Sequence, residues 1–186
     1  MRPEKLLTEA FAPWLVLTVG SKQLGAVVKS PGWGIVTGIG LGGLPQAAIT
    51  WRVRRKALSD HHVTRREDRP LVIAGIAGSV VTLMLAQKRY SAPPELRRMT
   101  RAALVSLGVA GAATLKIKVS FHTAVLAGVV AVFAREVSPR CWWGLGLVPP
   151  VAWARVRISH HTLLETGLGC AIGAAGGYWG GGRSVN

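Results

Sequence analysis

Long apolar runs without a charge restrict the folds that this chain can adopt. Residues 71–87, LVIAGIAGSVVTLMLAQ, carry no charged side chain and approach the length of about 20 residues that a helix needs to cross a bilayer. A second uncharged run extends from Trp33 to Trp51, and its Pro45 should kink a helix. Further apolar segments lie at about 10–28, 102–115, 123–134, 141–153 and 163–181. The pattern predicts an all-α integral membrane bundle of six or seven transmembrane helices.

Composition agrees with a single membrane domain covering residues 1–186. Charged residues make up 17% of the chain, against roughly 25% in soluble domains, and the mean hydropathy is +0.34. The net charge of +15 does not indicate a nucleic-acid partner, because the basic residues lie between apolar segments and not on one amphipathic face. Lys and Arg at helix ends reach the headgroups instead. We therefore expect a multi-pass protein of the cell membrane that binds no nucleic acid.

Ionisable residues gather in three places along the sequence. These are the segment 52–70 and the junctions 116–122 and 155–165, which together contain all five histidines. If the intervening apolar segments cross the membrane and return, the three places fall on the same face. Ionisable groups at the membrane edge are costly, so their default interpretation is functional.

Three short sequences in these places, RREDRP, KVSFHTA and ARVRISHHTLLETGLG, resemble the motifs of the type 2 phosphatidic acid phosphatase superfamily. The family patterns are K-x6-R-P, P-S-G-H and S-R-x5-H-x3-D, and the resemblance covers about residues 55–180. The matching residues are Arg69 and Pro70, then Ser120 and His122, then Arg155, His161 and Glu165. The departures are His62 at the lysine position, Val119 and Phe121 around the serine, Ala154 for Ser, and Glu165 for Asp.

The residue types suit phosphoryl transfer. His161 and Glu165 are four apart, which on a helix puts them on one face, so that the carboxylate can orient the imidazole for attack on phosphorus. The resemblance implies that His161 forms a phosphohistidine, and that His122 protonates the departing lipid oxygen and then activates water. It also implies a phosphate-binding set, for which the candidates are Arg69, Arg155, Ser120, Lys118 and His62.

The expected activity is hydrolysis of a lipid phosphomonoester or pyrophosphate, with a polyprenyl phosphate derivative, a polyprenyl diphosphate or phosphatidic acid as substrate. We expect no metal or other cofactor, because no H-E-x-x-H or comparable ligand cluster is present, and we assign Cys141 and Cys170 no function. A soluble vanadium haloperoxidase, which uses similar residues, would not need the apolar segments. A membrane scaffold or transporter descended from the phosphatase is the alternative, favoured by the altered first and second motifs.

The membrane side of the site is indicated by the distribution of basic residues. The segments 52–69, 116–118 and 155–157 hold eleven Lys and Arg, against seven in 88–101 and 135–140. Without Arg69 and Arg155 the comparison is nine to seven. The positive-inside rule then favours a site that faces the cytoplasm.

Overall fold

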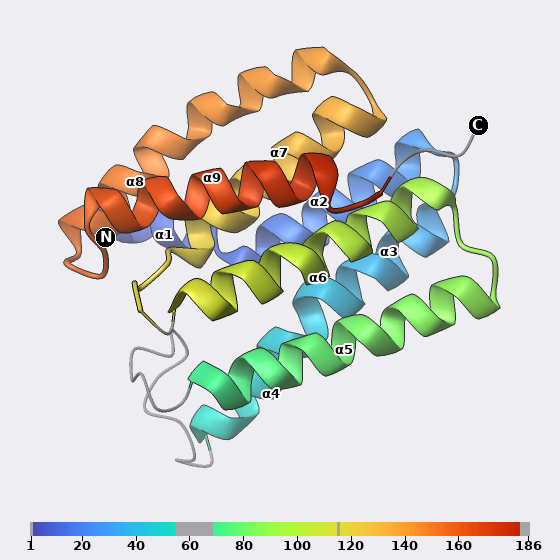
Figure 1. Ribbon diagram of the computed structural model, residues 1–186, viewed down its shortest axis with the longest axis horizontal. Helices are drawn as coiled ribbons and strands as arrows, with labels where there is room; N and C mark the ends of the chain where they lie inside the picture. The colour runs from blue at the N-terminus through green and yellow to red at the C-terminus, as the bar shows by residue number, and fades with distance from the viewer. Residues whose placement is uncertain (1, 55–68, 115, 183–186) are drawn as a thin grey trace.

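The computed structural model describes residues 2–54, 69–114 and 116–182, and this part of the chain is helical without a strand (Figure 1). The side chains of residues 69–71 lie outside the description. The α-helices are α1 (Pro3–Ala10), α2 (Pro13–Val27), α3 (Pro31–Gly38), α4 (Leu44–Arg54), α5 (Arg69–Arg89), α6 (Pro94–Thr114), α7 (Phe121–Glu136), α8 (Val148–Arg157) and α9 (Leu163–Trp179). A π-helix, η1 (Ile39–Gly43), joins α3 to α4, and a 3-10 helix, η2 (Pro139–Leu147), precedes α8. The all-α prediction is confirmed for these residues.

Prolines determine several of the helix boundaries. Helices α1, α2 and α3 each begin with proline, which lacks an N–H that the first turn would leave unpaired. The kink expected at Pro45 takes the form of η1, which ends just before α4. Because Pro45 cannot donate to the Leu41 carbonyl and its ring crowds that oxygen, a wider turn accommodates it.

Glycines of α9 let its backbone touch that of α7. A Cβ on Gly173 would lie 1.9 Å from the carbonyl oxygen of Ala124, and one on Gly169 would lie 2.4 Å from that of Ser120. Further along, a Cβ on Gly177 would lie 2.3 Å from the carbonyl oxygen of Gly128. The paired residue numbers rise together, so the two helices run parallel and begin at the same end of the bundle. Small residues at this spacing are typical of close helix packing in membranes.

The outer surface of the bundle carries many apolar side chains. Leu85 on α5 is 64% exposed, and Val81, Val105 and Val109 are also exposed. Within the ranges that the structure covers, one helical stretch, Val72–Arg89, has the length and hydropathy of a membrane span, and 17% of it is buried. The segments 10–28, 123–134 and 163–181 form the shorter helices α2, α7 and α9, and 102–115 lies in α6, which contains several arginines. The segment 141–153 is divided between η2 and α8, and the run from Trp33 to Trp51 is divided among α3, η1 and α4. The number of membrane crossings is therefore not established.

An ion-pair network joins α6 to the end of α7. Arg98 donates from Nε and Nη2 to the carboxylate of Glu136 at 2.6–3.0 Å, and from Nη2 to Glu95 at 3.2 Å. Arg135 adds a contact to Glu136 at 3.5 Å. Both Arg98 and Glu136 are largely buried, so each charge depends on the other for the interactions that water would otherwise supply.

Candidate functional site

Two of the three segments predicted to share a face come together in the structure. The α6–α7 and α8–α9 junctions lie at the same end of the bundle, beside the end of α4 and the start of α5 (Figure 1). Lys118 Nζ donates to the carbonyl oxygen of His160 at 2.6 Å, and the Ser120 N–H donates to that of Glu165 at 3.2 Å. In the third segment His62 lies outside the described residues, and for Arg69 only the helical backbone is described.

His161 and Glu165 form the expected pair. The distance from His161 Nδ1 to Glu165 Oε2 is 3.0 Å. The reason given from the sequence is wrong, however, because the two residues do not share a helix face. Thr162 is the N-cap of α9, so His160 and His161 both precede the helix.

A capping box brings the carboxylate to the imidazole. The hydroxyl of Thr162 accepts the N–H of Glu165 at 3.3 Å, and Glu165 Oε2 accepts the N–H of Thr162 at 3.0 Å. The same Oε2 contacts His161. An ionised carboxylate can only accept hydrogen bonds, so Nδ1 carries the proton and Nε2 keeps its lone pair. This is the arrangement that a nucleophilic imidazole requires.

Burial is the main factor that lowers the pKa of His161 below its ordinary 6.5. The positive charges of Arg155 and Lys118 lower it further, whereas the hydrogen bond and charge of Glu165 oppose the shift. The imidazole is therefore neutral at neutral pH. A neutral ring can attack phosphorus, whereas an imidazolium cannot.

Arg155 is a buried cation at the end of α8, with 3% of its surface exposed. Its carbonyl oxygen accepts the N–H groups of His160 and His161, at 3.1 and 3.3 Å, which fixes the turn that carries the candidate nucleophile. Its Nε and Nη1 are buried and make no hydrogen bond to the described residues. Buried guanidinium N–H groups need an acceptor, and an oxyanion offers the matching geometry.

The other candidates differ in their access to an anion. His122, in the first turn of α7, is 5% exposed and lines the same pocket as His161 and Arg155. Lys118 also lines this pocket, in addition to holding the turn before α9. Ser120 does not line it: its N–H is used by Glu165, and its hydroxyl is fully buried. The backbone N–H of Ser120 is therefore not available to a phosphate.

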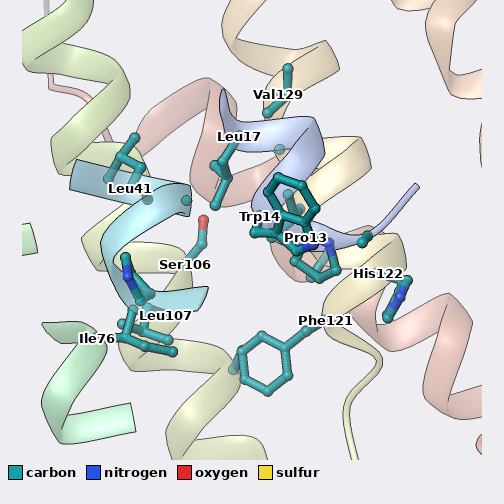
Figure 2. A pocket seen from close by; sticks show the side chains of 18 of the residues that line it. Pro13, Trp14, Leu17, Leu41, Ile76, Ser106, Leu107, Phe121, His122 and Val129 are labelled. Atoms are coloured by element: carbon teal, nitrogen blue, oxygen red, sulfur yellow. The ribbon is translucent and has the colours of Figure 1, made fainter. Parts of the chain in front are cut away.

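The pocket that these residues line has a volume of about 280 Å³ and is mainly apolar. Its walls come mainly from α2, η1, α4, α5, α6 and α7. In Figure 2, His122 lies at one side of the pocket, and Leu41 and Ile76 lie at the other, with Trp14 between them. One pocket thus combines a cationic end with an apolar interior.

Sequence reasoning missed two contributors. Glu9, at the end of α1, lines the pocket together with Arg155. The sequence offered one signal for α1, which is the proline that begins α2 and separates the two helices. Thr162 was also missed, although the sequence T-L-L-E from Thr162 to Glu165 fits the capping-box pattern. The capping-box pattern predicts that the last helix begins at residue 163, as the structure shows.

No group of three His, Cys, Asp or Glu side chains is placed to hold a metal ion among the residues with assigned positions. Comparison of the chain with protein-family models, with curated proteins and with solved structures found no match.

Proposed function

We propose that the protein is an integral membrane phosphatase that hydrolyses a lipid phosphomonoester or pyrophosphate through a phosphohistidine. The observation that carries the proposal is the meeting of three groups at one pocket: a neutral His161 oriented by Glu165, a buried Arg155 with unpaired N–H groups, and His122. Nucleophile, anion clamp and proton donor are the parts that phosphoryl transfer needs.

The chemistry follows from the positions of these groups. Nε2 of His161 attacks phosphorus while Arg155 binds the phosphoryl oxygens, and the bond from phosphorus to the lipid oxygen breaks. Protonated His122 donates its proton to the departing oxygen. Neutral His122 then takes a proton from water, whose oxygen attacks phosphorus and breaks the P–N bond. Inorganic phosphate leaves, and both histidines regain their starting protonation states.

Glu165 stabilises the positive charge that develops on His161 during attack, because its carboxylate stays hydrogen-bonded to Nδ1. The beginnings of α7 and α9 also point toward this end of the bundle. Helix N-termini carry partial positive charge, which favours an anion between them.

A lipid is the substrate that best fits the pocket. A soluble phosphate ester would need only the cationic end, whereas the walls beyond His122 are formed by leucine, isoleucine, valine and alanine side chains. The outward-facing apolar residues of α3, α5 and α6 further support residence in a bilayer. Six or seven crossings, the number expected from the apolar segments of the sequence, are part of the proposal. The same residues favour a membrane protein over a soluble haloperoxidase.

The cytoplasmic orientation of the site remains part of the proposal. It is supported by the count of Lys and Arg in the sequence, eleven in the segments on the site's face against seven on the other, or nine against seven without Arg69 and Arg155. Labelling of single cysteines from outside intact cells tests it: strong external labelling at residues 52–54 would reverse the orientation.

Phosphate release from a panel of lipids by the purified protein tests the activity. The panel contains a polyprenyl phosphate, a polyprenyl diphosphate and phosphatidic acid, each assayed with and without a chelator. We expect turnover of at least one lipid, unaffected by chelation and absent from His161→Ala. Binding of these lipids without phosphate release would instead support a scaffold or transporter.

A further inference from the structure

Glu9 is the acidic side chain that lines the pocket, within the portion of the chain that is described. It lies one residue before the end of α1, and α1 packs against α8, which carries Arg155. Glu9 itself is exposed, whereas Arg155 is buried. The carboxylate therefore stands at the open rim of the pocket, with the buried guanidinium behind it.

The two charges influence each other. Burial lowers the pKa of Arg155 below its ordinary value, and the negative charge of Glu9 opposes that shift. In the pocket without an anion, Glu9 thus offsets part of the cost of burying a positive charge. When a phosphate binds to Arg155, the same carboxylate repels it, because both carry negative charge.

We propose that Glu9 is a built-in counter-ion of Arg155, which stabilises the empty site and weakens its binding of phosphate. The proposal rests on the proposed function only in taking Arg155 as the phosphate clamp. Its consequence for turnover is faster release of inorganic phosphate, the doubly charged product. Glu9 acts through Arg155 and the bound anion and takes no part in bond breaking.

The experiment measures binding of inorganic phosphate to the purified full chain by calorimetry, without any lipid substrate. Glu9→Gln keeps the shape of the side chain and removes its charge. Glu4→Gln is the matched control, because Glu4 is on the same helix but does not line the pocket. We expect about three- to tenfold tighter phosphate binding by Glu9→Gln, as removal of one charge near a rim predicts, and no change for Glu4→Gln.

Thermal unfolding gives a second measurement. Glu9→Gln should lower the unfolding temperature of the phosphate-free protein more than Glu4→Gln does, and saturating phosphate should close the difference. Unchanged or weaker phosphate binding by Glu9→Gln would overturn the proposal, even if the wild type hydrolyses lipids. Tighter binding in a protein that hydrolyses no lipid would uphold it while refuting the phosphatase function. If the wild type binds no phosphate, both proposals fail.

Discussion

Replacement of Gly173 by alanine should test whether the contact between α7 and α9 sets the geometry of the site. The added Cβ would lie 1.9 Å from the carbonyl oxygen of Ala124, whereas a carbon–oxygen contact needs about 3.3 Å. The helices must therefore separate by about 1.4 Å, the difference between these two distances. Because His122 lies on α7 and Glu165 on α9, this separation moves the proposed proton donor, His122, away from the proposed nucleophile, His161.

A displacement of this size has two measurable consequences. A misplacement of about 1 Å can lower a catalytic rate by about 100-fold, so we expect a loss of that order in kcat. Overpacking should also lower the free energy of unfolding by ~1–3 kcal/mol. The assays are phosphate release from the best lipid of the panel and thermal unfolding in the same detergent.

Two other glycines supply the controls. A Cβ on Gly167, also on α9, meets nothing within 4 Å, so Gly167→Ala should keep full activity and gain up to ~1 kcal/mol from helix propensity. A Cβ on Gly128 would lie 3.3 Å from the carbonyl oxygen of Gly173, so Gly128→Ala should give an intermediate loss. If Gly173→Ala and Gly167→Ala had equal activity and stability, the proposed role of the contact would be wrong.

Three further predictions concern individual side chains. His161→Ala should abolish both turnover and the formation of a phosphoenzyme. His122→Ala should lose less activity with a nitrophenyl phosphate than with a lipid, because nitrophenolate leaves without a proton. Near-normal turnover of the lipid by either variant would contradict its role. In a pH profile of kcat/KM, the fall in activity toward acid should occur below pH 6.5, because the pKa of His161 is lowered. Lys118→Met should move this fall to higher pH, because the Lys118 charge lowers the pKa of His161. Glu165→Gln should move it to lower pH, because Glu165 raises that pKa. Since unfolded His161 titrates near 6.5, acidification below that pH protonates the unfolded chain first and reduces stability, until the pKa of the folded state is passed. If both variants moved the acidic side of the profile in the same direction, the charges of Lys118 and Glu165 would not control the pKa of His161. Glu136→Gln should lower the free energy of unfolding by up to ~3–5 kcal/mol, because the buried guanidinium of Arg98 then keeps only Glu95 as a carboxylate partner. The value of kcat below the unfolding temperature should stay unchanged. A thermal melt together with an activity assay checks this, and an unaltered melt would count against it.

The order of the helices could be predicted from the sequence because uncharged runs and prolines mark them directly. Pro93 and Pro94 separate α5 from α6, and the breaks near Pro13 and Pro31 fall as their missing N–H groups require. The π-helix before Pro45 could not be predicted, since it depends on how the surrounding helices hold the chain on both sides of the proline. The number of membrane crossings could not be predicted from the sequence either. Helices of 15–17 residues are shorter than a typical span, and whether they cross depends on the packing of neighbouring helices and on the bilayer thickness.

The pairing of His161 with Glu165 followed from their spacing, but its geometry depended on where the helix begins. Spacing alone does not distinguish two residues on one helix face from two residues on either side of an N-cap. The role of Glu9 was hidden for another reason: it is more than 140 residues from Arg155 in sequence, and only the packing of α1 on α8 brings it to the pocket.

The double use of Glu165 Oε2 couples the geometry of the candidate site to the first turn of α9. One oxygen holds both the N–H of Thr162 and Nδ1 of His161, so a frayed helix end releases the imidazole at the same moment. Helix ends open more readily than the packed interior, where Gly173 lies against α7. Gentle heating should therefore inactivate the protein reversibly before the bundle loses its helices, with activity falling at a lower temperature than the circular-dichroism signal. The glutamate side chain reaches both partners, so the proposed nucleophile is held only as long as the helix cap stays formed.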